Sequence, residues 1–155
     1  MELNHEYIRG LIDGEGCFTF CSVPNLKEGE WIKAQIPAFV LSMHVRDKEL
    51  IKSVAETLSL RNRIYTYKRR LVKDNYNHGA MSTLIVRDLG RLKNIIVPFF
   101  YKKLVGYKGV QLEEWIERIE NNVMVPKKYK VIPLLYKTGF YDKNNKFTGV
   151  GRPTN

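Results

Sequence analysis

Cysteine is scarce in this chain of 155 residues, which holds only Cys17 and Cys21. Four positions apart on one strand, they would lie about 13 Å from each other, whereas a disulfide needs Cα atoms within about 7 Å. No further cysteine or histidine stands nearby at the spacing of a zinc site. The two cysteines are therefore expected to be small apolar side chains in a reducing compartment.

Long hydrophobic runs are also missing, and none approaches the roughly 18 apolar residues that span a membrane. The longest candidate, residues 95–100, contains Pro98 and is flanked by lysines. The first six residues are acidic and polar, unlike a secretory signal or a transit peptide. We expect an intracellular protein without a membrane partner. The sequence leaves open an organelle (mitochondrion or chloroplast) or a bacterial or archaeal cytoplasm.

Acidic residues are outnumbered, with 16 against 26 lysines and arginines, so the net charge is +10. Such an excess favours a polyanionic partner, and nucleic acid is the usual one. The first 30 residues have the opposite charge balance, with six acidic residues and two basic ones. An acidic segment in a nucleic-acid-binding protein requires its own explanation.

Hydrophobic periodicity predicts a helix that Asn4 caps and that ends at Gly14-Glu15-Gly16. The further expected elements are a strand at 17–23, a turn at 24–30, an extended stretch at 31–45, a helix from a cap at Asp47 to about 60, strands at 61–70 and 81–87, a helix at 88–97 ended by Pro98, and a short helix at 112–120. This α-β-β-α-β-β-α order, with one more helix, predicts an α+β fold in which helices back an antiparallel sheet. One domain is expected over residues 1–120, followed by a basic, partly ordered extension over 121–155.

Residues 8–16 read Ile-Arg-Gly-Leu-Ile-Asp-Gly-Glu-Gly, and Phe18 follows them. This stretch resembles the nine-residue signature of the LAGLIDADG homing endonucleases. Residues 39–47 (Phe-x-Leu-x-x-His-x-x-Asp) and the segment 98–104, which looks like the family's stretch ending in its catalytic lysine, extend the resemblance over roughly residues 5–120. It implies a four-stranded antiparallel saddle sheet backed by helices. It also implies site-specific cleavage of double-stranded DNA across the minor groove, leaving short 3′ overhangs.

Gly10 and Gly14 lie four positions apart, so one helix face lacks side chains and another helix backbone can approach it closely. A relaxed helix end would explain Gly14 but not Gly10. A chain with one such motif needs a second copy, and the resemblance implies an isologous homodimer with Gly10, Asp13 and Gly14 at the interface. Two-fold symmetry in turn implies a long, near-palindromic DNA target.

The resemblance makes Glu15 a catalytic metal ligand for Mg²⁺ or Mn²⁺, helped by the backbone carbonyl of Gly14. Two Glu15 carboxylates at a two-fold axis would repel each other unless a cation lay between them, and this would explain the acidic start of the chain. Asp13 is expected to be structural. The resemblance places a second catalytic residue at Lys103, near the scissile phosphate, although Lys102 leaves that assignment open by one residue.

Two positions depart from the family signature. Arg9 replaces a small residue, so we expect it to point away from the dimer interface and to pair with Asp13 one turn on. Glu15 stands where the signature letters have aspartate, and a longer carboxylate can ligate a metal equally well.

Basic and polar side chains along the strands, and in the loop between the third and fourth strands, are the expected DNA contacts. They are Lys33, Gln35, Arg61, Arg63, Thr66, Lys68, Arg69, Arg70, Lys73 and Ser82. Only every second residue of a strand can face the groove, and the sequence does not separate phosphate contacts from base contacts.

Three other functions remain open on the sequence: an RNA-binding intron maturase of the same fold, a cleavage-inactive DNA-binding regulator, and a basic ribosome-associated protein. Glu15 and Lys103 argue against the inactive regulator, because a carboxylate beside phosphates serves no purpose in it. The ribosome-associated protein would leave the Gly10 and Gly14 face unexplained.

Overall fold

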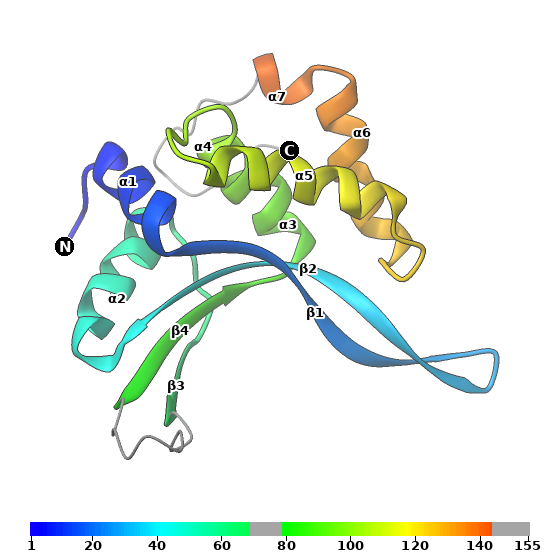
Figure 1. The fold of residues 1–155 in the computed structure, drawn as a ribbon, viewed down its shortest axis with the longest axis horizontal. Coiled ribbons are helices and arrows are strands. Elements are labelled where there is room, and N and C mark those ends of the chain that lie inside the picture. The colour runs from blue at the N-terminus through cyan, green and yellow to red at the C-terminus, as the bar shows by residue number, and fades with distance from the viewer. Residues whose placement is uncertain (69–78, 144–155) are drawn as a thin grey trace.

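Helices cover one face of a single antiparallel sheet (Figure 1). The computed structural model describes residues 1–68 and 79–143. The strands, in the order β1-β2-β4-β3 across the sheet, are β1 (Gly16–Lys27), β2 (Glu30–His44), β3 (Ile64–Lys68) and β4 (Ala80–Val86). The helices are α1 (His5–Glu15), α2 (Lys48–Thr57), α3 (Leu89–Arg91), α4 (Val97–Phe100), α5 (Lys108–Asn121), α6 (Val131–Lys137) and α7 (Phe140–Lys143), with short helical turns η1 (Val45–Asp47), η2 (Leu92–Ile96) and η3 (Lys127–Lys130). The predicted α+β fold is confirmed.

Aromatic side chains fill the space between the sheet and the helices. Phe18 of β1 and Phe39 of β2 stand opposite each other in the register, and their ring centroids are 5.6 Å apart. Phe100 packs 5.5 Å from Phe39, and Trp115 packs 5.7 Å from Phe18. Because side chains alternate along a strand, the residues between these positions point to the face that the helices leave uncovered.

The sheet bends into an arch, with β3 and β4 in one leg and the β1–β2 hairpin in the other (Figure 1). Tyr65 of β3 stands opposite Thr83 of β4, and Thr83 stands opposite Ser42 of β2. These three residues alternate with the buried Leu41 and Leu84, so they belong to the underside of the arch. We call this underside the uncovered face.

The turn predicted at residues 24–30 is shorter than expected. β1 and β2 pair in register out to Lys27 and Glu30, and the turn consists of Glu28 and Gly29, both with positive φ (52° and 80°). Such backbone angles suit a two-residue hairpin turn. Pro24 is tolerated because β1 is an edge strand, whose outer side requires no hydrogen-bond donor.

The prediction that Pro98 ends the helix is wrong. After α3 and the π-helical turn η2, the chain continues through α4 to Phe100, with Pro98 in the first turn of α4. A proline is accepted in a first helical turn, where its missing N–H would have no intrahelical partner. Asp47 precedes α2 as expected, but its side chain makes no capping hydrogen bond.

The described part of the chain beyond residue 120 is helical and packs on the same core. Tyr129, Ile132 and Tyr141 are buried there. The Tyr129 hydroxyl donates to the Arg87 carbonyl at 2.6 Å, which joins η3 to the end of β4. Packing is therefore continuous across residue 120. Within the described ranges, no helix is both long and apolar enough to cross a membrane.

Candidate active site

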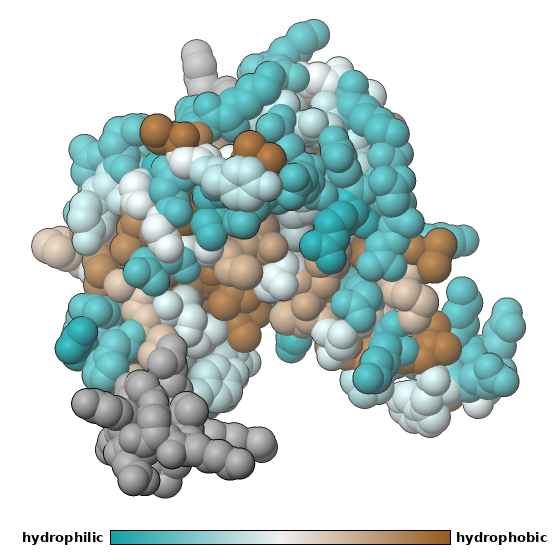
Figure 2. Space-filling view, in the orientation of Figure 1, coloured by the Kyte–Doolittle hydropathy of each residue, from teal (hydrophilic) through white to brown (hydrophobic). Residues whose placement is uncertain are grey.

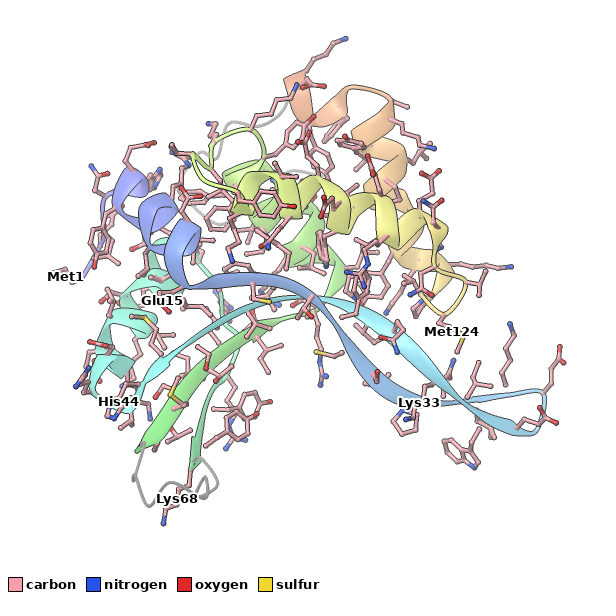
Figure 3. The ribbon with its side chains drawn as sticks, viewed as in Figure 1. Met1, Glu15, Lys33, His44, Lys68 and Met124 are labelled. Carbon is pink, nitrogen blue, oxygen red and sulfur yellow. The ribbon has the colours of Figure 1, made fainter. Side chains whose placement is uncertain are left out.

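Glu15 lies at the C-terminal end of α1, where the helix passes directly into β1 (Figure 3). Asn4 caps the other end of α1, its side chain accepting hydrogen bonds from the N–H groups of Glu6 and Tyr7. The junction after Glu15 needs a glycine, because a Cβ on Gly16 would lie 2.4 Å from Cγ2 of Ile12. The Glu15 side chain is exposed.

The last carbonyls of α1 add oxygen donors beside this carboxylate. A helix leaves its final C=O groups without intrahelical partners, and its C-terminal end carries partial negative charge. The Gly14 carbonyl is one of these groups, so it and Glu15 form an all-oxygen donor set of the kind that Mg²⁺ or Mn²⁺ prefers. Among the described residues, no three histidine, cysteine, aspartate or glutamate side chains lie close enough to hold a metal. The Glu15 carboxylate and the Gly14 carbonyl are thus the candidate oxygen donors at this end of α1.

Asp13 holds a loop in place. Its two carboxylate oxygens accept hydrogen bonds from the N–H groups of Val105 and Gly106, each at 3.0 Å. These bonds join the end of α1 to the segment that follows Lys103. The contact explains a structural aspartate within one chain, whereas its expected place at a dimer interface stays a prediction.

The predicted pairing of Arg9 with Asp13 is wrong. Arg9 is buried, with Nε donating to the Phe99 carbonyl at 3.0 Å and its guanidinium 4.3 Å from the centre of the Phe99 ring. Its second partner is the Glu6 carboxylate, one turn before it on α1. Arg9 therefore fastens α1 to α4 and leaves the Gly10 side of the helix open.

Lys102 and Lys103 differ in their partners. Lys102 donates to Oδ1 of Asp142 at 2.5 Å, and this bond raises the pKa of Lys102 and lowers that of Asp142. Lys103 is half-buried, and its ammonium has no hydrogen-bond or ion-pair partner among the described residues. Of the two lysines, Lys103 is the one whose charge is available to a phosphate.

The sheet register divides the expected DNA contacts between the two faces. On β2, Lys33 and Gln35 lie an even number of residues from the buried Phe39, so they point to the same side. On β3, Thr66 and Lys68 stand opposite Ser82 and Ala80. Those two residues alternate in step with the buried Leu84 of β4. These four therefore lie on the helix-covered side, although Lys33, Thr66 and Lys68 are exposed beyond the helices.

Ser82 requires a correction. Its side chain is fully buried, with no hydrogen-bond partner for the hydroxyl in the described part of the chain, so it does not reach a surface that DNA could touch. Arg61 is exposed in the segment before β3. Arg69, Arg70 and Lys73 lie outside the described residues.

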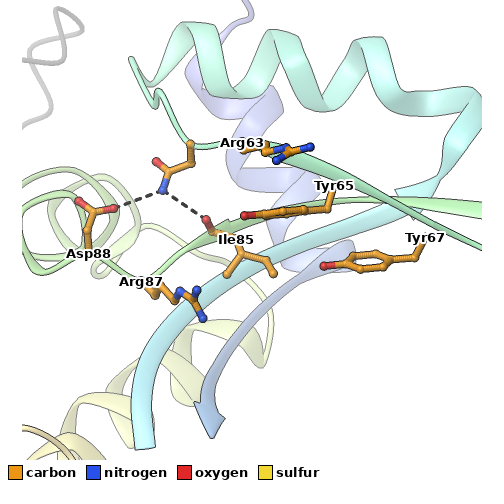
Figure 4. A pocket seen from close by; sticks show the side chains of 7 residues that line it. Arg63, Tyr65, Tyr67, Ile85, Arg87 and Asp88 are labelled. Carbon is orange, nitrogen blue, oxygen red and sulfur yellow. Dashed lines mark hydrogen bonds between the residues drawn. The ribbon is translucent and has the colours of Figure 1, made fainter. Parts of the chain in front are cut away.

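Arg63 lines a cavity of about 500 Å³ on the uncovered face (Figure 4). Its guanidinium carbon lies 5.4 Å from the centre of the Tyr65 ring, and Tyr65 stacks on Tyr67 with ring centroids 6.1 Å apart. The full lining is Asn62, Arg63, Tyr65, Tyr67, Ile85, Arg87 and Asp88. Asn62 fixes the back of the cavity, donating to the Asp88 carboxylate at 3.2 Å.

Sequence reasoning missed Arg87 as part of this cavity. Its charge lies just beyond β4, and only the β3–β4 register shows that it falls beside Arg63 and Tyr65. The alternation of Arg63, Tyr65 and Tyr67 was visible in the sequence and marks one face of β3.

Comparison with known proteins agrees with this geometry. A family model described as LAGLIDADG endonuclease matches residues 8–119. The fold is similar to that of the homing endonuclease I-TnaI, with 22% sequence identity and a TM-score of 0.59, over 94% of this chain and 82% of that one. No curated protein matches the sequence.

Two further similar structures are DNA complexes. One is the LAGLIDADG homing endonuclease I-GzeII in complex with its DNA target (20% identity, TM-score 0.57, 97% of this chain and 40% of that one). The other is the I-LtrWI LAGLIDADG homing endonuclease bound to target DNA (27% identity, TM-score 0.55, 95% and 45%). This chain spans less than half the length of those two. The family model covers most of the sequence, including Glu15 and Lys103, and the chain belongs to the LAGLIDADG endonuclease family.

Proposed function

We propose that this chain is the subunit of a homodimeric, metal-dependent endonuclease that cuts double-stranded DNA at a long, near-palindromic site. The observation that supports it most is the exposed Glu15 carboxylate beside a glycine face of α1 that no described residue covers. A Cβ built on Gly10 or Gly14 meets no atom within 4 Å. Packing within one chain thus gives no reason for a glycine at either position, and a second α1 backbone in close contact does.

Glu15 and the Gly14 carbonyl of each subunit would hold Mg²⁺ or Mn²⁺ near the two-fold axis. A bound metal ion would supply an activated water and charge stabilisation for the departing oxygen. Lys103, which has no carboxylate partner among residues 1–68 and 79–143, would neutralise negative charge that develops on the scissile phosphate. Asp13 would keep the loop after Lys103 in position through its bonds to Val105 and Gly106.

The uncovered face would lie along the major groove, with the cut across the adjacent minor groove leaving short 3′ overhangs. Arg63 and Arg87 would reach base edges, and the support for this is that both line the cavity on that face. Lys33, Gln35, Thr66 and Lys68 lie on the helix-covered side, away from the base edges, so any contact they make would be to phosphates and sugars, which fix position rather than sequence. Arg61 is assigned to phosphates and sugars as well. Arg69, Arg70 and Lys73 are expected to add to them.

The test is cleavage of DNA that spans the insertion site of the protein's own gene, with and without Mg²⁺. Specific double-strand cleavage that requires the metal, by a protein that sediments as a dimer, is the expected result. Specific DNA binding without cleavage would indicate a regulator instead. Splicing assistance to an intron RNA, without either DNA activity, would indicate a maturase.

A further inference from the structure

The uncovered face has two regions of different chemistry. The β3–β4 leg presents Arg63, Tyr65 and Arg87 around its cavity. The β1–β2 leg presents every second residue of the two strands, those that alternate with the buried Phe18 and Phe39. Within residues 17–25 of β1 and 32–40 of β2, none of these side chains is charged. These are Cys17, Thr19, Cys21, Val23 and Asn25 of β1 and Ile32, Ala34, Ile36, Ala38 and Val40 of β2.

We call these residues the stripe, and they differ in how much of each side chain is exposed. Ala34 and Ala38 are buried, whereas Val23, Ile32 and Val40 keep part of their surface accessible. Apolar surface is visible on the underside of the arch in Figure 2. The lysine nearest in sequence to the stripe on β2, Lys33, belongs to the opposite face by alternation. The stripe therefore carries no cation, and between its polar members Thr19 and Asn25 its accessible surface at Val23, Ile32 and Val40 consists of methyl groups.

We propose that this stripe reads DNA through apolar contacts with thymine methyl groups, so that the target is T-rich along the part of each half-site that lies under the β1–β2 hairpin. The inference rests on the proposed function. Thymine is the one base that presents a methyl group in the major groove, and apolar side chains are its usual partners. At Val23, Ile32 and Val40, base edges that offer only donors and acceptors would lose water without gaining a hydrogen bond.

DNA fits this surface better than a protein partner does. The stripe adjoins the cavity that holds Arg63 and Arg87, because Val40 stands opposite Ile85 of the cavity lining, and it begins two residues after Glu15. The chain as a whole has a net charge of +10. Side chains on one face of a strand are spaced about 6.6 Å apart, close to two base-pair steps of 3.4 Å, so each strand can contact about every second base pair.

The experiment starts from a library of randomised DNA duplexes from which the wild-type homodimer selects sites that it cuts. Thymines are expected to be enriched at a set of positions repeated symmetrically about the cut. At those positions, replacing thymine by deoxyuridine removes only the methyl group. Each replacement is expected to weaken binding about fourfold, the effect of one buried methyl group. Replacement at positions without enrichment is expected to have no effect.

Val23→Ala is the variant, because Val23 is on the stripe and is not part of the buried core. It is expected to lose the thymine-over-deoxyuridine preference at one position of each half-site. Leu26→Ala is its matched control: Leu26 is on the same hairpin and 56% exposed, but has the parity of Phe18 on the other face. The control is expected to keep every preference.

Specific cleavage with equal affinity for thymine and deoxyuridine at all positions would overturn the inference and leave the proposed function standing. A thymine-over-deoxyuridine preference that neither Val23→Ala nor Leu26→Ala changes would also overturn the inference. A wild-type protein that neither binds nor cuts any duplex of the library would instead overturn the proposed function.

Discussion

Lys102 donates a hydrogen bond to Asp142 across 2.5 Å, joining the turn after α4 to α7, 40 residues further along the chain. The Tyr101 hydroxyl donates to the same carboxylate oxygen at 3.3 Å. Lys102 has a φ of 58°, a conformation that a residue with a Cβ rarely adopts, so the surrounding contacts must stabilise the turn. We call the three residues the clamp. Because Lys103 follows it directly, the clamp sets the direction in which Lys103 leaves the turn.

Asp142→Asn is expected to slow DNA cleavage about twofold to fivefold without changing DNA affinity. The loss is expected to be small, because the ion pair between Lys102 and Asp142 is exposed to solvent. Single-turnover cleavage and binding in Ca²⁺ measure the two effects separately. Glu120→Gln is the control, since it breaks the exposed pair between Lys137 and Glu120, which lies away from the turn. An unchanged cleavage rate in Asp142→Asn would show that Lys103 does not depend on the clamp.

The clamp is expected to hold equally well over the whole neutral pH range. The hydrogen bond from Lys102 lowers the pKa of Asp142, so the stabilisation is present above the usual aspartate value of about 3.9 and is lost as pH falls below it. The same bond raises the pKa of Lys102, so its contribution is lost only as pH rises beyond about 10.4. The ratio of wild-type to Asp142→Asn cleavage rates should therefore stay constant between about pH 5 and pH 9. A ratio that drifts within this window would contradict the assignment.

Lys103→Ala is expected to reduce cleavage by about 10² to 10³, the usual cost of removing one charge-stabilising group from an active site. Lys102→Ala should cost no more than Asp142→Asn, because its ammonium already binds a carboxylate. The cleavage rates of Lys103→Ala and Lys102→Ala on the same DNA target show which of the two lysines takes part in cleavage. Equal losses would mean that the structure does not distinguish their roles.

Much of the fold could be predicted because the signals are local. The Asn4 cap, the glycines that end α1 and the alternation of β2 each depend on a few neighbouring residues, and the structure has them where they were expected. The helix end predicted at Pro98 was wrong because a π-helical turn before the proline lets the helix continue, and no sequence pattern predicts such a turn. The partner predicted for Arg9 was wrong because the group that it binds, the Phe99 carbonyl, is 90 residues away in the sequence.

The site was harder to predict than the fold for the same reason. Ser82 looked like a polar strand residue, and only the register with Thr66 and Met43 puts it on the buried side. The clamp joins residues 40 positions apart, and the cavity joins β3 to the residue after β4. Contacts between distant segments follow from strand pairing and packing, which hydrophobic periodicity alone does not determine.

Gly10→Leu is expected to leave a folded monomer that no longer dimerises. A Cβ at Gly10 meets no atom of the described residues outside its own helix within 4 Å, so the leucine is expected to leave the subunit folded, but it would occupy the space of the second helix. Sedimentation measures the dimer, and thermal unfolding checks the fold. Gly90→Leu is the control, at another helical glycine with open space around it. A Gly10→Leu protein that dimerises and cuts like wild type would rule out α1 as the interface.

Glu15→Gln is expected to abolish cleavage while leaving DNA binding intact or slightly tighter. The amide keeps the size and shape of the side chain but lacks the charge that would hold Mg²⁺, and it removes a negative charge that would face phosphates. Asp13→Asn is the comparison within the same helix. It weakens two hydrogen bonds from backbone N–H groups to a carboxylate, so it should lower the free energy of unfolding by about 1–3 kcal/mol before it affects the metal.

The two variants are compared on one DNA target, with Mg²⁺ for cutting and Ca²⁺ for binding, alongside thermal unfolding of each protein. Glu15 is exposed, so its replacement should leave the unfolding temperature unchanged. Near-normal cutting by Glu15→Gln would remove Glu15 from the metal site. Loss of binding together with cutting would mean that Glu15 supports the fold, because a carboxylate that serves only the metal is not needed for affinity.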